Sequence, residues 1–553
     1  MKKVLGGALI AEVFKREGVK YIFGLAGGHI YAMMEGAEER GIKYIGVRHE
    51  MTASFMAEGW ALVTGTPGVC TGTAGPGFTN MVTGLASAAN SKTPVVCIGG
   101  KCMVTENDRN DLQDIDQISM VKHICKHART VLEVERIPEY VGRAIAACKT
   151  GRPGPVYLEI PRDIADTEVD LASVEFQNNY TNSSKCVADP EVVAQAVELI
   201  NKAERPVLVV GSGVRFAKAH EELQAFVEKT GMPMFARHAG RGTVPEDHPL
   251  SLGLASHTNF TFAKAVAKSD LVVIIGTTTG YTMNRKVFPK ETKIIRVDID
   301  PVEVNNQLDA TIAIVGDAKN VLKQFNASVT AKVNKEWPQF LRDMKARVMQ
   351  KFMPLFTCED NPIHPVRLIG ELQKRLDKDT ILVVDGGDSA GWARNLLPVL
   401  SPGGMPGIIS SGFGALGVGA GYAMAAKLAF PDKKVILFTG DGAFGYYATE
   451  TETAVRYGIN YTTIILNDMQ WGMIRRSEAN KSADKADFVG LDLSNTRYDK
   501  VVEALGGHGE YVTEAKDLGP ALDRALQANK PSCVNVMTNP KFGPRDPQFV
   551  HKE

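Results

Sequence analysis

Short apolar runs recur along the chain and alternate with longer stretches of helical periodicity. Runs of four to seven apolar residues without polar alternation are typical of strands buried on both faces of a parallel sheet. Helical patterns over Leu5–Glu17, Met51–Thr64 and Asn334–Lys351 lie between or beside them. The pattern predicts an α/β fold with doubly wound parallel sheets covered by helices on both faces. The expected strands are Tyr21–Phe23, Tyr44–Val47, Val95–Ile98, Val156–Ile160, Val207–Val210, Leu271–Ile275, Ile294–Val297, Ile381–Val384, Val435–Thr439 and Thr462–Leu466.

These elements fall into three blocks, and 553 residues are too many for a single hydrophobic core. We expect domains over 1–180, 190–330 and 361–540, followed by a C-terminal tail over 541–553. The polar segment 178–184 is typical of a linker between the first two domains.

Composition excludes several classes of function. Lysine plus arginine (63) equals aspartate plus glutamate (63), so we expect neither nucleic acid nor an anionic membrane as partner. The apolar runs are too short to span a bilayer. The eight cysteines form no Cys-x-x-Cys pair, which favours buried free thiols in a reducing cytoplasm.

Two acidic residues follow neighbouring strands of the third block. Gly440-Asp441-Gly442 comes after one strand and Asn467-Asp468 after the next, with 24 residues between Gly442 and Asn467. Parallel strands end on the same edge of a sheet, so Asp441 and Asp468 are expected side by side where ligands bind. Two oxygen ligands beside a glycine turn suit a divalent cation that carries a diphosphate. Gly-Asp-Gly alone is equally typical of a surface turn, but the spacing and the flanking strands favour the metal.

This pattern resembles the signature of thiamine diphosphate (ThDP) enzymes, Gly-Asp-Gly followed by about two dozen residues and Asn-Asn or Asn-Asp. The resemblance implies Mg²⁺ held by Asp441, Asp468 and the backbone carbonyl of Gln470. Asp468 departs from the many members that carry a second asparagine, but it still offers a hard oxygen. The residues implied around the diphosphate are Gly440, Gly442, Ala443, Asn467, Gly472 and Met473.

Arg48-His49-Glu50 follows a predicted strand and precedes a predicted helix. A carboxylate at this place is often one that only stabilises a helix N-terminus. The strand followed by Arg-His-Glu also resembles ThDP enzymes, in which the matching glutamate hydrogen-bonds N1′ of the aminopyrimidine. The resemblance implies that Glu50 shares a proton with the ring, whose 4′-imino form then removes the proton at C2.

Two glycine-rich loops resemble further parts of the cofactor site. Within 411–417, Leu416 matches the apolar residue that bends the cofactor, and Gly414 matches the residue whose carbonyl meets the 4′-amino group. Without the flanking glycines, Leu416 would be typical of an ordinary core leucine. The loop 73–77, which contains Gly75 and Pro76, resembles the one that lines the pyrimidine.

The resemblance covers nearly the whole chain in the order pyrimidine, middle Rossmann-like and diphosphate domain. That is the layout of the group of acetolactate synthase, benzaldehyde lyase and 2-hydroxyacyl-CoA lyase. It implies a homodimer in which Glu50 and Asp441 of one site come from different subunits, commonly paired into a tetramer.

The reaction is less determined by the sequence. Gln113 matches a glutamine that reaches the substrate in benzaldehyde lyase and acetolactate synthase, and His29 matches a substrate-side histidine of benzaldehyde lyase. Ala26 departs from benzaldehyde lyase, which has another histidine there. His29 is also typical of a loop histidine with its hydrogen bonds satisfied. The resemblance implies a lyase or carboligase that acts on a carbonyl substrate, a 2-hydroxy ketone or 2-oxo acid, through an enamine. Acetolactate synthase and an enzyme like 2-hydroxyacyl-CoA lyase or oxalyl-CoA decarboxylase are the alternatives.

Two remoter alternatives depend on other features. A non-catalytic ThDP-binding protein would lack Glu50 or Asp441, and both are present. An NAD-dependent oxidoreductase would need a complete glycine fingerprint, but Gly211-Ser-Gly213 lacks the third glycine. The segment 276–283 also lacks the arginine-containing pattern of a flavin site, so the sequence does not favour FAD or ADP in the middle domain.

Overall fold

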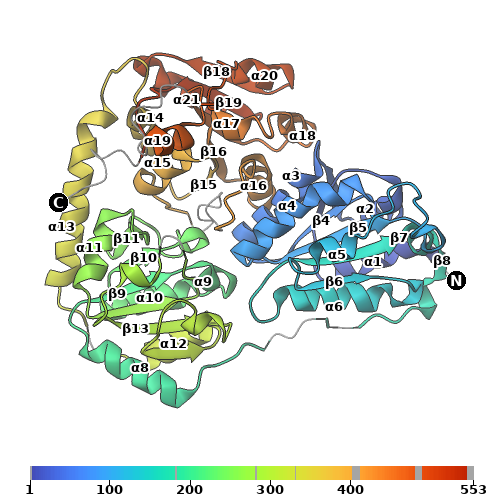
Figure 1. The fold of residues 1–553 in the computed structure, drawn as a ribbon, viewed down its shortest axis with the longest axis horizontal. Helices are drawn as coiled ribbons and strands as arrows, with labels where there is room; N and C mark the ends of the chain where they lie inside the picture. Colours follow the sequence, from blue (N-terminus) through green and yellow to red (C-terminus); the bar gives the residue numbers. More distant parts are fainter. Residues whose placement is uncertain are drawn as a thin grey trace. The chain divides into compact units, whose positions relative to one another are not determined.

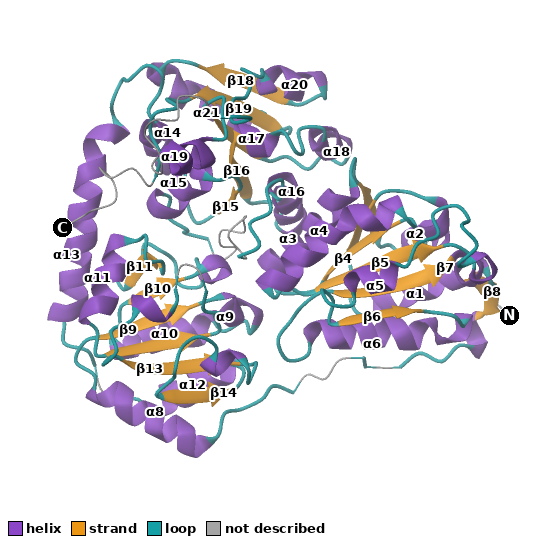
Figure 2. Cartoon of the chain, in the orientation of Figure 1, coloured by secondary structure: helices purple, strands orange, loops and turns teal. Residues whose placement is uncertain are grey.

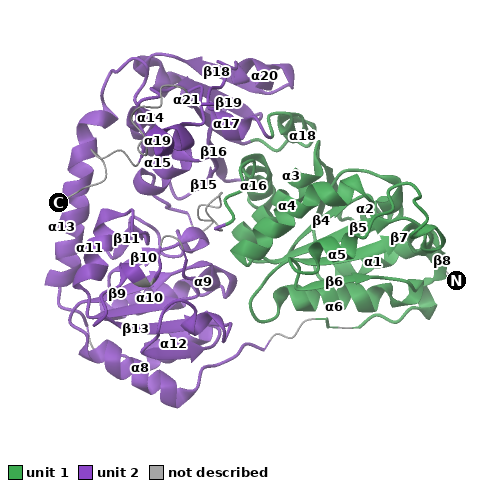
Figure 3. Cartoon of the chain, in the orientation of Figure 1, with its two compact units in different colours: residues 1–183, 413–431, 447–460 green, residues 184–412, 432–446, 461–553 purple. Residues whose placement is uncertain are grey.

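The computed structural model describes residues 3–177, 179–180, 184–280, 283–330, 332–401, 412–479 and 488–544 (Figure 1). Ser411, Tyr281, Thr282, most of the predicted linker and the tail from Arg545 onward lie outside these ranges. The chain divides into two compact units (Figure 3). The first comprises residues 1–183, 413–431 and 447–460, and the second comprises 184–412, 432–446 and 461–553.

The first unit is built on a six-stranded, wholly parallel sheet. Its order is β3 (Lys43–Gly46), β2 (Tyr21–Gly24), β4 (Gly68–Gly72), β5 (Val95–Lys101), β7 (Val156–Pro161) and β6 (His127–Thr130). The short strands β1 (Lys3–Leu5) and β8 (Glu168–Asp170) form a separate antiparallel pair. The helices of this unit are α1 (Gly6–Arg16), α2 (Tyr31–Glu38), α3 (Glu50–Thr64), α4 (Pro76–Ser91), α5 (Gln117–Val121), α6 (Ile137–Lys149), α7 (Arg162–Asp166), α16 (Gly419–Ala429) and α18 (Glu450–Arg456).

Successive side chains of these strands pack into cores on opposite faces of the sheet, which is why consecutive residues of the strands are apolar. Val96 and Ile98 of β5 belong to a core with α1, α2 and α6. Cys97 points the other way and meets Met81 of α4 with its sulfur. A parallel strand buried on both faces needs apolar residues at consecutive positions, and the predicted doubly wound arrangement is confirmed (Figure 2).

The second unit contains two more wholly parallel sheets. The order of the first is β11 (Ser251–Leu254), β10 (Met234–Ala236), β9 (Pro206–Val210), β12 (Leu271–Ile275), β13 (Lys293–Asp298) and β14 (Ile312–Val315). The order of the second is β15 (Thr380–Val384), β16 (Lys434–Gly440), β17 (Thr462–Asn467), β19 (Ser532–Met537) and β18 (His508–Val512). The α-helices are α8 (Pro190–Lys202), α9 (Ser212–Phe216), α10 (His220–Thr230), α11 (Phe260–Lys268), α12 (Ala318–Ser328), α13 (Glu336–Phe352), α14 (Pro365–Gln373), α15 (Asp388–Leu396), α17 (Asp441–Phe444), α19 (Gly472–Ala479), α20 (Tyr498–Ala504) and α21 (Leu518–Gln527).

The segment between β16 and β17 does not form a single crossover helix. It forms two short helices, α17 and α18, and α18 belongs to the first unit together with α16 (Figure 3). One reason why α16 belongs to the first unit is that it packs closely on α3. A Cβ on Gly59 would lie 2.8 Å from the Cα of Tyr422, and a Cβ on Gly421 would lie 2.8 Å from the Cβ of Phe55. Glycine at both positions lets the two helix backbones approach each other closely.

A buried carboxyl group, Glu58, lies on α3 beneath this helix contact. The Ser91 hydroxyl donates to its Oε1 at 2.6 Å, and Ser87 and Tyr422 also bond to it. Burial raises the pKa of Glu58 to about 7, so its neutral form is favoured in the folded protein.

We expect Glu58→Gln to flatten the pH dependence of stability. An unfolded glutamate releases its proton at about pH 4.3, whereas folded Glu58 keeps it until about pH 7. The free energy of unfolding of the wild type should therefore fall as pH rises through this window, by on the order of 3 kcal/mol from this group. Urea denaturation at several pH values between 4.5 and 8 measures the slope, with the exposed Glu221→Gln as control. Equal slopes for wild type and Glu58→Gln would contradict the prediction.

Candidate functional site

Asp441 and Asp468 lie at the carboxyl ends of adjacent parallel strands. In the register of β16 and β17, Gly440 is the partner of Leu466, which brings the residues after each strand to the same edge. Asp441 is 3% exposed, and its Oδ2 has no hydrogen-bond partner within the described residues. Burial and the charge of Asp468 raise the pKa of Asp441 to about 7. A pair of carboxylates, one buried and one half-buried, is suited to a divalent cation, which would compensate both charges.

Asp468 has partners on its other side. Gln470 Nε2 donates to its Oδ2 at 3.1 Å, and the Arg476 guanidinium lies 3.5 Å from the same oxygen. Arg476 also pairs with Asp388 at the N-terminus of α15. These contacts hold the Asp468 carboxyl group in one orientation, and burial still raises its pKa.

The backbone after Asp468 turns sharply. Met469 has a left-handed backbone (φ 56°), and Gln470 then pairs with Asp492 in an antiparallel bridge. The bonds of this bridge run from Trp471 N to Leu491 O and from Leu493 N to Met469 O. Gln470 is therefore in the non-hydrogen-bonded position, and its own carbonyl points away from the 491–493 segment. The bridge to 491–493 therefore does not use this carbonyl.

Close approaches explain the glycines of this motif. A Cβ on Gly442 would lie 2.6 Å from the Trp471 ring, and a Cβ on Gly472 would lie 2.6 Å from Asp468 Oδ2. Any larger residue would displace a neighbour of the carboxylate pair. Next to them, Ala443 is buried and Met473 is half-buried.

Asn467 serves the turn itself. It is fully buried, its Nδ2 donates to Asn535 Oδ1 at 3.1 Å, and its Oδ1 accepts from Met469 N at 3.2 Å. Its side chain thus stabilises the turn that carries Asp468.

In the first unit, Glu50 is the first residue of α3 and is 5% exposed. Asn80 Nδ2 donates to its Oε2 at 2.9 Å. Its Oε1 lies 3.4 Å from where a Cβ on Gly77 would be, so this glycine leaves space at the carboxylate. The helix was expected to begin at Met51, and it begins one residue earlier because the His49 side chain caps it by accepting from Met51 N.

The turn between β4 and α4, residues 73–77, contacts both predicted substrate-side residues, His29 and Gln113. Thr73 Oγ1 bonds His29 Nδ1 at 2.9 Å. A Cβ on Gly75 would lie 2.9 Å from the Cβ of Gln113, whose own backbone is left-handed (φ 64°). Burial, and then the charge of Arg162, lower the pKa of His29, so a neutral imidazole is favoured. Pro76 is the first residue of α4 and is exposed.

Gln117 was missed in the sequence although it connects these loops. It is fully buried, and its Oε1 accepts from Gly75 N at 2.9 Å. Its Nε2 lies 2.9 Å from each of Gly100 O, Tyr157 Oη and Glu159 Oε2, and its two hydrogens are shared among these three oxygens. Apart from its place four residues after Gln113, the sequence carries no signal for this role.

Gly414 and Leu416 also belong to the first unit. Gly414 has a left-handed backbone (φ 70°), and among the described residues no atom lies within 4 Å of a Cβ placed there, while Leu416 is half-buried. The leucine is therefore not an ordinary core residue in this structure.

In the middle sheet, the glycine turn after β9 packs against the glycine turn after β12. Gly213 N donates to Gly276 O at 2.8 Å, and a Cβ on Gly211 would lie 2.3 Å from the Cβ of Thr277. The amide of Gly213 is thus bonded to the neighbouring turn, and the expectation that FAD and ADP are not favoured in this domain stays a prediction.

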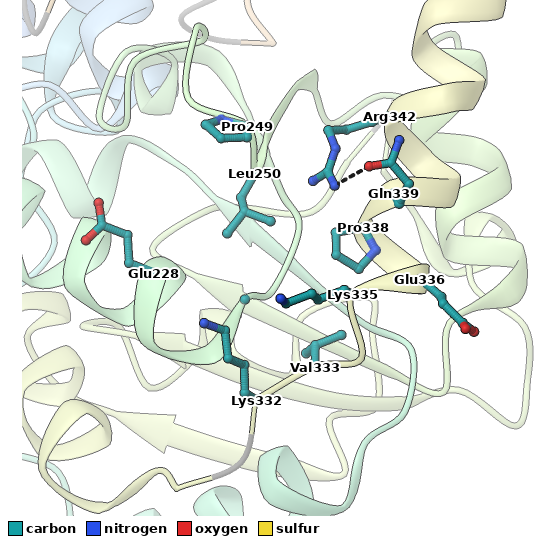
Figure 4. A pocket seen from close by; sticks show the side chains of 11 residues that line it. Glu228, Pro249, Leu250, Lys332, Val333, Lys335, Glu336, Pro338, Gln339 and Arg342 are labelled. Carbon is teal, nitrogen blue, oxygen red and sulfur yellow. Dashed lines mark hydrogen bonds between the residues drawn. The ribbon is translucent and has the colours of Figure 1, made fainter.

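A hollow of about 510 Å³ lies elsewhere on the middle domain (Figure 4). Gly231 and Leu250, which line it, precede β10 and β11, so the hollow lies at the amino ends of these strands. Ligands of open parallel sheets bind at the carboxyl ends. The hollow also has walls of both charge signs, including Glu228, Lys332 and Arg342, and we assign it no ligand.

Within the described ranges, no helix has both the length and the apolar character that crossing a membrane requires. The chain matches three family profiles: the N-terminal TPP binding domain of thiamine pyrophosphate enzymes over residues 5–120, the central domain over 193–325 and the C-terminal TPP binding domain over 385–536.

Three relatives match almost from end to end. The acetolactate synthase large subunit IlvG of Mycobacterium tuberculosis is 32% identical over 541 residues, which cover 97% of this chain and 96% of the relative. The 2-hydroxyacyl-CoA lyase of Arabidopsis thaliana is 30% identical over 569 residues (99% and 98%). The oxalyl-CoA decarboxylase of Escherichia coli K12 is 29% identical over 549 residues (97% and 95%). With these matches, the chain belongs to the thiamine pyrophosphate enzyme family, in the group whose members are named as synthases, lyases and decarboxylases.

Proposed function

We infer that the protein is a Mg²⁺- and ThDP-dependent lyase or carboligase that makes or breaks a C–C bond next to a carbonyl. The observation that carries this inference is the pair of buried Asp441 and half-buried Asp468, in which Asp441 Oδ2 has no hydrogen-bond partner among the described residues. In this proposal, these two carboxylates and the Gln470 carbonyl hold the cation. Gly440, Gly442, Ala443, Gly472 and Met473 surround the diphosphate, and Asn467 fixes the turn. The domain limits 1–180, 190–330 and 361–540 are part of the same proposal.

ThDP, when bound, supplies an electron sink for a carbonyl carbon. Glu50 would hold a proton at N1′ of the aminopyrimidine, and its fixed contact with Asn80 supports this role. Gly75 and Pro76 would line the pyrimidine, Leu416 would support the bent cofactor, and the Gly414 carbonyl would accept from the 4′-amino group.

On the substrate side, we assign His29 and Gln113 as hydrogen-bond donors to the oxygen on which negative charge develops. The lowered pKa of His29 favours a neutral imidazole. In this proposal the Thr73 hydroxyl donates to Nδ1, so that Nε2 carries the proton and donates to the substrate. The loop contacts of Gln117 and Gly75 support a fixed place for Gln113.

The substrate remains a choice between two classes. A 2-hydroxy ketone or 2-oxo acid suits a benzaldehyde lyase-like or acetolactate synthase-like reaction, and the mycobacterial relative favours the latter. An acyl-CoA substrate is the second candidate, favoured by relatives named 2-hydroxyacyl-CoA lyase and oxalyl-CoA decarboxylase at nearly equal identity.

A substrate panel with Mg²⁺ and ThDP tests the proposal. Benzoin, pyruvate, 2-hydroxyacyl-CoA and oxalyl-CoA are incubated separately, and products are identified by mass spectrometry. Turnover of free oxo acids or hydroxy ketones supports the first class, and turnover of thioesters alone supports the second. Failure of every substrate with a ThDP-loaded protein would overturn the proposed reaction.

We propose further that Glu50 and Asp441 of one site come from different subunits of a homodimer. Glu50→Gln and Asp441→Ala protomers, each inactive alone, should then complement each other after mixing, refolding and reassembly. In a mixed dimer one of the two sites has both native residues, so an equal mixture should recover about a quarter of wild-type activity. If both residues served the same subunit's site, the mixture would stay inactive.

A further inference from the structure

The turn that presents Glu50 is held by side chains of a distant segment of the same unit, α18 and the residue after it. Glu450 is the first residue of α18 and is 1% exposed. Its Oε1 accepts from the backbone amides of Arg48 at 3.1 Å and His49 at 3.0 Å. These are the two amides directly before Glu50.

The same segment also holds the end of β3. The Tyr457 hydroxyl accepts from Gly46 N at 2.8 Å, and Arg456 Nη2 donates to Gly46 O at 2.7 Å. Four backbone groups between Gly46 and His49 are thus bound by three side chains of 450–457.

Glu450 is itself fixed. Thr453 Oγ1 donates to its Oε2 at 2.7 Å, and Arg48 N also lies 3.2 Å from that oxygen. Thr52, on the first turn of α3, adds a further side-chain bond. A buried carboxylate with this many donors has little freedom to move, and charge-assisted bonds of this kind are stronger than neutral ones.

The direction of the Glu50 side chain depends on the backbone before it. A helix N-terminus without such contacts frays, and the first residue of the helix changes direction with it. For a group that must meet one ring nitrogen, a displacement of about 1 Å can cost roughly 100-fold in rate.

We propose that Glu450 is a positioning residue for Glu50: through the amides of Arg48 and His49 it fixes the strand-to-helix turn so that the Glu50 carboxyl group meets the cofactor. The proposal rests on the proposed function. It assigns Glu450 no contact with the cofactor or the substrate.

Glu450→Gln is the informative variant because it keeps the size of the side chain and replaces one accepting oxygen with a donating NH₂ group. Proton–deuterium exchange at C2 of bound ThDP, followed by NMR, reports on Glu50 directly. We expect exchange to slow by about 10- to 100-fold, while the calorimetric Kd for ThDP with Mg²⁺ changes by less than about threefold.

A double-mutant cycle separates positioning from a merely structural role. When Glu50→Gln is already present, adding Glu450→Gln should slow the exchange no further. A structural role would instead lower Tm, raise Kd and slow exchange together, also in the Glu50→Gln background. That pattern, or wild-type exchange in Glu450→Gln, would overturn the proposal.

Thr453→Val is a second variant that tests the same proposal if Glu450→Gln does not fold. It removes only the hydroxyl that donates to Glu450 and should slow C2 exchange a few-fold with an unchanged Kd, whereas unchanged exchange would count against positioning. Wild-type protein that neither binds ThDP nor exchanges the C2 proton would refute the proposed function itself. The two failures are therefore distinguishable.

Discussion

Glu50→Gln should leave ThDP bound and slow proton exchange at its C2 by roughly 10²- to 10⁴-fold, the effect of a lost acid–base group. Glutamine has nearly the same shape, and its carbonyl oxygen can still accept from Asn80 Nδ2. It cannot take up and release a proton, so the aminopyrimidine would lose its proton partner at N1′. The kcat should fall in parallel while the Kd for ThDP stays within a few-fold.

Glu58→Gln is the matched control for this experiment. It makes the same chemical change on the same helix, eight residues further along, where Ser91, Ser87 and Tyr422 bond to the carboxyl group. Exchange in Glu58→Gln should match the wild type. Near-normal exchange in Glu50→Gln would refute the role of Glu50, and equal slowing in both variants would point to a disturbed α3 instead.

The strands could be predicted from the sequence because buried parallel strands carry an unmistakable local signal. Leu271–Ile275 has five consecutive apolar residues, and the structure forms β12 over the same residues, with Val272 and Val273 in different cores. Elements that depend on tertiary contacts carried no such signal. The antiparallel pair β1 and β8 joins residues 3–5 to 168–170 and has too few residues to show a pattern.

The part of the candidate site that could be predicted from the sequence lies at the ends of two successive strands. Asp441 and Asp468 each follow an apolar run, so their adjacency followed from the rule that parallel strands end on one edge. Gln117 and Glu450 were not predictable because their roles arise from side chains that reach distant backbone amides. Glu450 lies 401 positions after His49, and only the fold brings them together.

The hydrogen bonds of Asn467 show a structural role that its place in the sequence motif does not indicate. The resemblance places it near the diphosphate, and in the structure its amide group is bonded to Asn535 and to the Met469 amide. A role in shaping the turn before Asp468 leaves no local pattern in the sequence, and only the hydrogen bonds of the folded chain reveal it.

Asp441→Ala should abolish Mg²⁺-dependent retention of ThDP. A lost ligand should weaken binding by at least the 10- to 100-fold typical of groups that only support metal ligands. Isothermal titration with ThDP in the presence of Mg²⁺ measures the loss.

The thermal stability of the ligand-free protein should not fall in Asp441→Ala, in contrast to its affinity for ThDP, and this difference makes the prediction specific. Without Mg²⁺ and ThDP, burial and repulsion from Asp468 oppose the ionised form of Asp441, so Asp441→Ala should melt at the same temperature as the wild type or higher. Ligands at 100 times their Kd should stabilise the wild type by about 2.7 kcal/mol and leave Asp441→Ala unchanged.

Asp468→Asn is the control, since it keeps an oxygen ligand and many family members carry asparagine at this position. It should retain ThDP and Mg²⁺ and show the ligand-dependent rise in Tm. If Asp441→Ala also retained both, the cation would have to be held elsewhere, and the unpartnered Oδ2 of Asp441 would need another explanation.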